Sequence, residues 1–299
     1  MTKLDIVVLT EDRYVAPKET DTYIENILLE DQLVIDALRK EGLKAERKSW
    51  SDPDFDWSTT KYVLFRTTWD YFDRFEEFNK WLTSVSAQTT LLNSAKIINW
   101  NIDKHYLNDL KEQGVPVCET HFIKKGTQTN LKELHKQLGW TKTVLKPCIS
   151  GAARHTYKLT NETIDAYENI FQQLINHEDM MLQPFQENIL TKGEYSFIVI
   201  DGTYSHAVLK IAKPGDFRVQ DDFGGTVHQH VASTQQIAFA ENAVKACVEL
   251  PIYARVDVII DNTNALAISE IELIEPELWF RNAPEAATKL AKGIKKRMQ

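Results

Sequence analysis

The chain has 299 residues, of which 43% are hydrophobic and 26% charged, as in a globular protein large enough to bury a substantial core. The 43 acidic and 35 basic side chains give a formal net charge of −8, which argues against nucleic acid as the main partner because phosphate binding needs a basic surface. No apolar run reaches the roughly 18 residues of a membrane span, and no signal-peptide pattern begins the chain. The widely spaced cysteines fit neither a zinc site nor a disulfide framework. We therefore expect a cytoplasmic protein without a membrane partner.

The first part of the chain alternates between strand and helix patterns. Apolar runs at residues 6–9 and 62–65 predict two strands, and a stripe of isoleucine and leucine between them predicts an amphipathic helix. Thr22 and Glu25 fit a capping box at the start of this helix. Strand, helix and strand in this order indicate a parallel sheet, so we expect an α/β domain that ends near residue 95.

The remainder of the chain divides into two parts without a flexible linker between them. Residues 96–189 have the pattern of a small α+β unit, in which a strand at 144–147 and its hairpin partner at 156–159 are the clearest elements. Residues 190–299 are richer in strands, and Asp201-Gly202 between two apolar runs is a strong hairpin signal. We expect three parts that pack together.

A later hairpin carries charges at alternate positions. Arg255 and Asp257 lie on its first strand, and Glu270 and Glu272 lie on its second. Because side chains alternate across a strand, each pair shares a face. A four-residue loop would pair position 261 with 266, 257 with 270 and 255 with 272, and would bring all four charges together.

Three carboxylates in one patch repel one another and need a compensating cation beyond one arginine. Oxygen ligands without His or Cys favour magnesium, or manganese, over zinc. The alternative is a solvated sheet face, a pattern that Glu275 and Glu277 would continue past the strand. The sequence of the hairpin alone does not decide between the two.

Two basic positions and a small-residue loop suggest an anion site. Lys146 lies in an apolar strand, where a buried lysine requires an anionic partner. The loop of residues 150–154 begins with four small residues, Ser-Gly-Ala-Ala, before Arg154, and the backbone N–H groups of such a loop can approach a phosphate. Lys104 lies near a helix start. Each of these features has an alternative. Lys146 could lie on an edge strand and reach water, the loop could be a plain hairpin turn, and Lys104 could be a solvated surface lysine.

A substrate contact is expected in the first domain. Arg66 and Asp70 directly follow the strand at residues 62–65, at its carboxyl end, where open α/β sheets place ligand contacts. We expect Arg66 to pair with a substrate carboxylate and Asp70 with an amino group. The alternative is a structural salt bridge, with Trp69 and Tyr71 in the core.

Taken in chain order, these motifs resemble the ATP-grasp superfamily. The motifs are Lys104, Leu145-Lys-Pro147 with the loop of residues 150–154, Gln183-Pro-Phe185, Gly193-Glu-Tyr-Ser196, Arg255-Val-Asp257 and Glu270-Ile-Glu272. Four further stretches resemble the subgroup that includes the ATP-grasp enzyme of D-cycloserine biosynthesis. They are residues 66–71, 205–210, 215–220 and 274–278. The resemblance implies a Rossmann-like N-terminal domain followed by a two-lobed ATP-grasp domain with a largely antiparallel sheet.

The resemblance also implies ATP and Mg²⁺ as cofactors and assigns a role to each matched residue. The ATP-binding residues would be Lys104, Lys146, Ser150, Gly151, Ala152, Gln183, Pro184, Phe185 and Glu194. The γ-phosphate and the reacting carboxylate would face Lys210, Arg218 and Arg255. The metal would be held by Asp257, Glu270 and Glu272, of which Glu272 stands where many relatives have Asn.

The activity that the resemblance implies is ligation of a small amino-acid-like carboxylate, usually to an amine, through an acyl phosphate. Magnesium, lysine and arginine would stabilise the charge on the transferring phosphoryl group. A phosphotransferase and a nucleotide-binding protein without catalysis are the alternatives, and the complete acidic set argues against the second. A homo-oligomer is compatible with the resemblance.

Overall fold

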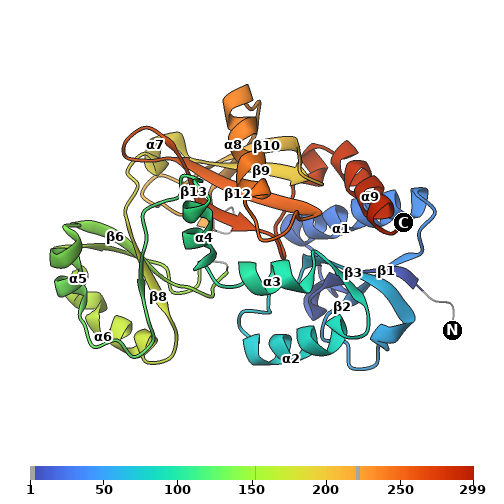
Figure 1. Ribbon diagram of the computed structural model, residues 1–299, viewed down its shortest axis with the longest axis horizontal. Helices are drawn as coiled ribbons and strands as arrows, with labels where there is room; N and C mark the ends of the chain where they lie inside the picture. Colours follow the sequence, from blue (N-terminus) through green and yellow to red (C-terminus); the bar gives the residue numbers. More distant parts are fainter. Residues whose placement is uncertain (1–3, 152, 220–222) are drawn as a thin grey trace.

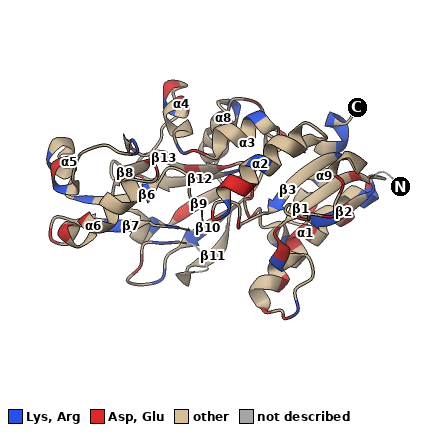
Figure 2. Ribbon diagram, turned by 90° about the horizontal axis from the view of Figure 1, so that it is seen from below, with Lys and Arg blue, Asp and Glu red and all other residues tan. Residues whose placement is uncertain are grey.

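The computed structural model describes residues 4–151, 153–219 and 223–299. Three β-sheets follow one another along the chain, and we call them the N-terminal, middle and C-terminal sheets. The two ends of the chain lie on the same side of the molecule, beside the N-terminal sheet (Figures 1 and 2). Within the described ranges, no helix combines the length and the apolar character that crossing a membrane requires.

The N-terminal sheet is parallel throughout, as the strand–helix–strand pattern predicted. Its strands are β1 (Leu4–Thr10), β2 (Ala45–Ser49), β3 (Thr60–Thr67) and β4 (Thr90–Leu92), and its helical segments are η1 (Asp12–Tyr14), α1 (Thr22–Lys40), η2 (Trp57–Thr59) and α2 (Phe75–Ser86). The strand order is β2-β1-β3-β4. The predicted capping box is wrong: the side chain of Asp21 caps α1 by accepting a hydrogen bond from the backbone N–H of Ile24 at 2.8 Å.

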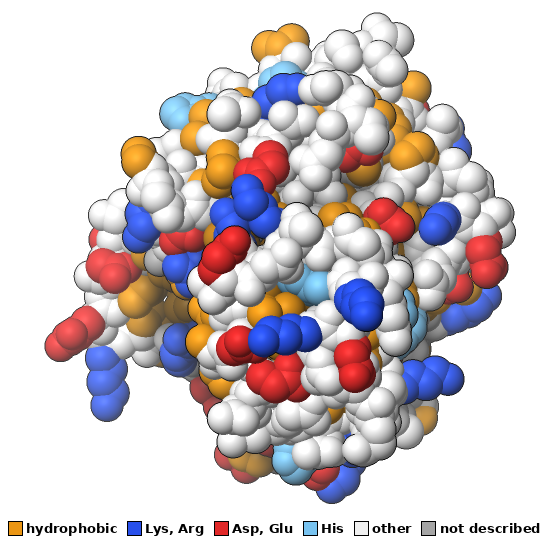
Figure 3. Space-filling view, turned by 90° about the vertical axis from the view of Figure 1, so that its left-hand side faces the viewer, with side chains coloured by type: hydrophobic (Ala, Val, Ile, Leu, Met, Phe, Trp, Pro, Cys, Tyr) orange, Lys and Arg blue, Asp and Glu red, His pale blue; other side chains and the backbone are white. Residues whose placement is uncertain are grey.

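The middle sheet is antiparallel and has its own apolar core. Its strands are β5 (His121–Ile123), β6 (Lys142–Pro147), β7 (Tyr157–Thr160) and β8 (Met180–Pro184), and its helices are α5 (Leu131–Leu138) and α6 (Ile164–Ile175). The order β5-β8-β6-β7 confirms the hairpin expected between β6 and β7. At this end of the molecule, acidic and basic side chains are interspersed on the surface (Figure 3).

The C-terminal sheet is antiparallel, with the order β11-β10-β9-β12-β13. Its strands are β9 (Glu194–Ile200), β10 (Thr203–Ile211), β11 (Thr226–His230), β12 (Tyr253–Ile260) and β13 (Leu266–Glu272). The helices of this part are α7 (Ile189–Lys192), α8 (Thr234–Lys245), η4 (Phe280–Asn282) and α9 (Glu285–Arg297), and α3 (Ala95–Asn101) and α4 (Tyr106–Glu112) precede the middle sheet. The Asp201-Gly202 hairpin joins β9 and β10 as predicted.

Two sets of helices pack across the expected boundaries. Apolar side chains of α3 and α4, such as Ile97 and Leu110, belong to one core with β9, β12 and β13, although the sequence pattern grouped these helices with the middle part. Leu290 and Ile294 of α9 share a core with Leu38 of α1 and with Ile198 of β9. The N-terminal and C-terminal sheets are therefore joined by continuous apolar packing, which fixes the position of the first domain against the C-terminal part.

Asn93 adds a polar connection between the same two parts. Its side chain is 2% exposed and donates to the carbonyl oxygens of Tyr253, at 3.0 Å, and of Leu273, at 2.8 Å. Its carbonyl oxygen accepts from the backbone N–H of Ile252 at 2.5 Å. The end of the N-terminal sheet is thereby tied to β12 and to the exit of β13.

We predict that Asn93→Ala lowers the free energy of unfolding by about 3 kcal/mol, because it leaves three buried backbone groups without partners. Urea denaturation followed by circular dichroism measures the change. Asn79→Ala, at an exposed position of α2, is the control and should change stability by less than about 0.5 kcal/mol. Equal stabilities of the two variants would contradict this role of Asn93.

Candidate active site

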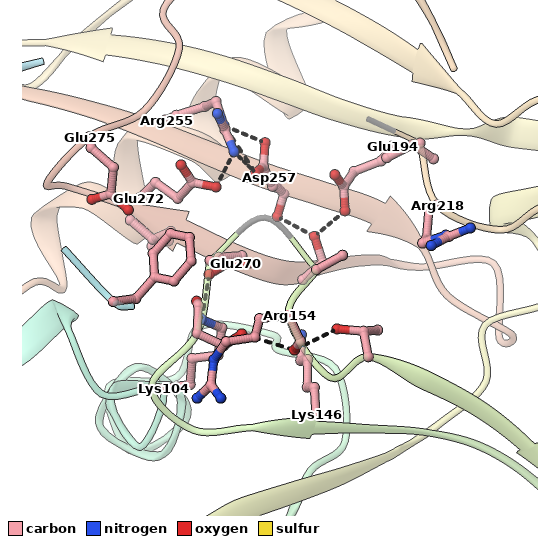
Figure 4. Close-up of a pocket in the computed structure, with 18 of the residues that line it drawn as sticks. Lys104, Lys146, Arg154, Glu194, Arg218, Arg255, Asp257, Glu270, Glu272 and Glu275 are labelled. Carbon is pink, nitrogen blue, oxygen red and sulfur yellow. Dashed lines mark hydrogen bonds and ion pairs between the residues drawn. The ribbon is translucent and has the colours of Figure 1, made fainter. Parts of the chain in front are cut away.

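A cavity of about 880 Å³ lies where the three sheets meet, and all three parts contribute to its walls. Acidic side chains of the C-terminal sheet form one side, and Lys104 and Lys146 lie across from them (Figure 4). A cavity of this size, lined by convergent charged groups, is the expected form of a small-molecule site.

Strands β12 and β13 bring the four predicted charges of the hairpin together. Arg255 lies opposite Glu272, and Asp257 lies opposite Glu270. The guanidinium of Arg255 donates to the carboxylate of Asp257, with an Nη2–Oδ2 distance of 2.9 Å, and also to Glu272. All four residues line the cavity, so the alternative of a solvated sheet face is wrong.

The turn of this hairpin differs from the prediction. Leu266 pairs with Ile260 rather than with Asp261, so the loop is one residue longer than expected. One extra residue on β13, Ser269, restores the register before the charged pairs, as a β-bulge does. The hydroxyl of Ser269 donates to the carboxylate of Glu194 at 2.7 Å. The bulge therefore also connects β13 to β9.

Lys210 on β10 continues the charged row across the sheet. It is 4% exposed, and its ammonium lies 2.6 Å from the carboxylate of Glu194 and 3.3 Å from that of Asp257. The hydroxyl of Ser196 also donates to Asp257. Lys210, Glu194 and Asp257 all line the cavity, which places the predicted residues of β9, β10 and β12 in one network.

Burial and charge act in opposite directions on these carboxyl groups. Burial raises the pKa of Asp257, but the charges of Arg255 and Lys210 outweigh it and hold that pKa below its ordinary value. Burial also raises the pKa of Glu270, but the charge of Lys104 outweighs this effect, and that pKa too lies below its ordinary value. Burial dominates at Glu272 and raises its pKa to about 7. Glu272 therefore has the least complete compensation of the three.

The predicted metal ligands offer hard oxygen donors from two adjacent strands, which is the donor set that Mg²⁺ prefers. In the structure each of the three is engaged by a cation of the chain: Asp257 and Glu272 by Arg255, and Glu270 by Lys104. Among the described residues, the group of potential ligands whose donor atoms all lie within 4.8 Å of one another is a different one, Asp103, His105 and Cys148. A dication would therefore have to draw the three carboxylates together from these ion pairs.

The two predicted phosphate-binding lysines differ in their surroundings. Lys104 is buried, and its ammonium donates to the carbonyl oxygen of Ser150 at 2.6 Å and lies 3.0 Å from the carboxylate of Glu270. Lys146 lines the cavity, and within the described ranges no hydrogen bond or ion pair of its ammonium is found. Burial lowers the pKa of Lys146. An anionic ligand would supply the negatively charged partner that this ammonium lacks.

The small-residue loop closes one side of the cavity. Ser150 and Gly151 line it, and Ala152 lies outside the described residues. A Cβ on Gly151 would lie 2.6 Å from the ring of Phe72 in the N-terminal domain, so glycine permits a close approach of loop and domain at this point.

The expected hinge residues Gln183, Pro184 and Phe185 line the cavity beyond Lys146. The amide of Gln183 donates to the hydroxyl of Thr120 at 2.8 Å. Arg218 also lines the cavity, but its guanidinium pairs with Asp216 at 2.8 Å.

The family comparisons agree with this geometry. Residues 113–276 match the family model for the ATP-grasp domain of prokaryotic glutathione synthetase. The chain belongs to the ATP-grasp family. In this ATP-grasp protein, residues 6–93 also match the model for the N-terminal domain of the D-cycloserine synthetase DcsG.

Individual relatives of this ATP-grasp protein match nearly its whole length. The cycloserine biosynthesis protein DcsG of Streptomyces lavendulae is 30% identical over 287 residues, which is 89% of this chain and 93% of that protein. The crystal structure of D-cycloserine synthetase DcsG has a TM-score of 0.84 at 27% identity and covers 98% of this chain and 100% of that one. A D-alanine–D-alanine ligase from Bacillus anthracis has a TM-score of 0.67 at 14% identity, over 98% and 96% of the chains, and shows a shared fold. The predicted fold class and resemblance are confirmed, and the family assignment supports an ATP-dependent ligase.

Arg66 of this ATP-grasp protein occupies a different place from the one expected. It is 1% exposed and is not among the residues that line the cavity. Its guanidinium donates to the carbonyl oxygen of Pro276 at 3.2 Å and lies 4.0 Å from Glu30 and 3.9 Å from Asp31. The expectation that Arg66 contacts substrate is therefore corrected in favour of its alternative, a structural ion pair, because the buried carboxylates of α1 need its charge.

Asp70 does line the cavity, but its carboxylate already accepts from the indole N–H of Trp50, at 2.7 Å, and from Arg74, at 2.8 Å. No sequence motif pointed to four further residues that line the cavity, Arg13, Tyr14, Tyr23 and Phe72. Glu275 and Glu277 also line it, although the sequence suggested them only as the continuation of a solvated acidic face and as part of the stretch 274–278. These residues lie in η1, at the start of α1, between β3 and α2, and after β13. No local pattern places these four segments together.

We predict that Arg66→Ala lowers the free energy of unfolding by about 3–5 kcal/mol, because it leaves Glu30 and Asp31 buried without this cation. Burial already raises the pKa of Asp31 to about 6 against the charge of Arg66. The measurement is chemical denaturation. Lys61→Ala, which removes an exposed pair with Asp5, should cost at most about 1 kcal/mol. A folded Arg66→Ala protein of unchanged stability would refute the structural role.

Proposed function

We propose that this protein is a magnesium-dependent ligase that activates the carboxylate of a small amino-acid-like substrate as an acyl phosphate and transfers the acyl group to an amine. The observation that carries the proposal is the charged row of Lys210, Glu194, Asp257, Arg255 and their β13 partners, which faces Lys104 and Lys146 across one cavity. ATP and a second substrate would meet between these two sides.

The nucleotide would lie along the wall formed by the middle sheet. Lys146 and Lys104 would bind its phosphates, and the segment of residues 183–185, which lines the cavity, would contact the adenine. Glu194, on β9, would accept hydrogen bonds from the ribose hydroxyls, in addition to its pair with Lys210. Backbone N–H groups of the small-residue loop, at Ser150, Gly151 and Ala153, would cover the phosphates.

Asp257, Glu270 and Glu272 would hold Mg²⁺, which when bound supplies positive charge to the oxygens of the terminal phosphates. Arg255 and Lys210 would have two roles. Together they pair with Asp257 and Glu272 in the structure, and they would stabilise the negative charge of the phosphoryl group during transfer. Arg255 and Lys210 line the cavity beside the carboxylates and meet both requirements.

The first step would form a bond between a substrate carboxylate oxygen and the γ-phosphorus while the bond to ADP breaks. An amine would then attack the acyl carbon, and inorganic phosphate would leave. Water must be excluded because it would hydrolyse the acyl phosphate. The contact of Gly151 with Phe72 closes the loop against the N-terminal domain and supports such exclusion. The relative that makes D-cycloserine supports an amino-acid-like substrate, and an intramolecular, ring-closing reaction is one form of this chemistry.

We predict that the double variant Asp257→Asn with Glu270→Gln abolishes magnesium-dependent ADP release, because it removes two of the three anionic ligands. A screen of D- and L-amino acids with small amines, with ADP and phosphate measured separately, supplies the assay. Release of both products distinguishes a ligase from a phosphotransferase, which retains the phosphate on its substrate. Circular dichroism confirms folding, and full activity in the folded double variant would exclude the metal assignment.

We predict that Lys146→Ala weakens binding of ADP by about 10- to 100-fold, as expected for loss of a charged hydrogen bond to phosphate. Isothermal titration calorimetry measures the affinity. Lys142→Ala is a matched control, because Lys142 lies on the same strand but is exposed and pairs with Glu187. If both variants bind ADP as the parent does, Lys146 is not a phosphate ligand.

A further inference from the structure

The segment that leaves β13 is anchored along its backbone by side chains of other elements. The carbonyl oxygen of Ile274 accepts from the hydroxyl of Tyr253 at 2.7 Å. The next two carbonyl oxygens accept from the N-terminal domain: that of Glu275 from the indole of Trp69, at 2.8 Å, and that of Pro276 from Arg66, at 3.2 Å. Arg66, which is absent from the cavity wall, thus helps to fix the path of a segment that forms it.

The same anchoring continues to the start of η4. Glu30 of α1 accepts from the backbone N–H groups of Phe280 and Arg281, both at 2.9 Å. The N-terminal domain therefore holds this segment at both ends. The side chain of Glu275, in this segment, points to the cavity beside Glu272 (Figure 4).

Glu275 differs in its charge environment from the cavity carboxylates that the C-terminal sheet provides. Glu194, Asp257, Glu270 and Glu272 each have a lysine or arginine within 4.0 Å. For Glu275, no such cation is found in the part of the chain that the structure describes, and its side-chain hydrogen bond is with Tyr71. Burial and the nearby charge of Glu272 raise the pKa of Glu275 to about 8.

The surroundings of Glu275 are aromatic. Trp69, Tyr71 and Tyr14 line the same end of the cavity, and the rings of Tyr14 and Trp69 meet edge to face at 5.9 Å. The nearby guanidinium of Arg13 is engaged by Glu11. An aromatic wall beside a carboxylate without a cation favours a small organic ammonium, which gains both an ion pair and contact with ring faces.

We propose that Glu275 binds the ammonium group of the second substrate and that Arg66, Trp69 and Glu30 act as positioning residues for it. The inference rests on the proposed function, since it places an amino compound at the end of the cavity away from the nucleotide. It predicts that the protein selects substrates that carry a free amino group at this end, and rejects the same molecules when that group is acylated.

Equilibrium binding tests the inference independently of turnover. The probes are D-serine and D-alanine and their N-acetyl forms, added to the protein with Mg²⁺ and the non-hydrolysable ATP analogue AMPPNP, and observed by saturation-transfer NMR. We expect the free amino acids to bind and the N-acetyl forms to bind at least about tenfold more weakly. Equal binding of both forms, or no binding of either amino acid, would overturn the proposal.

Variants then assign the effect to the residue. Glu275→Gln should weaken amino-acid binding about tenfold or more and raise the corresponding KM, while the affinity for AMPPNP stays within about twofold. Glu275→Asp keeps the charge, so its affinity for the amino acid should lie between those of the parent and of Glu275→Gln. Glu133→Gln, on the exposed face of α5, should bind the amino acid as the parent does. Unchanged amino-acid binding in Glu275→Gln overturns the inference. Absence of ADP release with every carboxylate would instead count against the proposed ligase activity.

Discussion

The structure around the cavity depends on the compensation of buried charge. Burial favours the neutral forms of Asp257, Glu270 and Glu272, and the pKa of Asp257 and of Glu270 falls below its ordinary value because cations lie beside these two groups. Arg255 and Lys210 come from the same sheet, whereas Lys104 comes from the turn before α4. The charged row is therefore stable only when the helices before the middle sheet are in place, which couples the site to the packing of α3 and α4 on that sheet.

The same requirement explains how the N-terminal domain takes part. Its buried carboxylates on α1 are met by Arg66, and one of them, Glu30, also accepts from the backbone of the segment after β13. Polar contacts from Asn93 and apolar contacts between α1 and α9 support the same junction. The domain thus contributes to the cavity through the position of a loop of the ATP-grasp domain as well as through its own side chains. The hairpin of β12 and β13 and the segment after β13 are consequently supported by the same junction.

Several elements could be predicted because their signals are local. The parallel N-terminal sheet follows from the order of apolar strands and an amphipathic helix, and the hairpins follow from their turn residues. The pairing of Asp257 with Glu270 was predicted correctly although the loop length was not, because Ser269 adds one residue that cancels the error. A bulge of this kind has no distinctive pattern in the sequence. The capping box at Thr22 was predicted one residue too late, since Asp21 and Thr22 are both suitable caps.

The sequence by itself determined the family, the sheets and the side chains that could carry the chemistry, because strand alternation places Arg255 with Asp257, and Glu270 with Glu272, on one face of their own strands. Only the tertiary structure decided the partners of those charges. Arg66 and Glu275 show the difference: each is a charged residue at the end of a strand, yet the first is buried against α1 and the second reaches the cavity. Which of them lines the cavity depends on elements more than two hundred residues apart in the chain, and local sequence carries no signal for contacts at that separation.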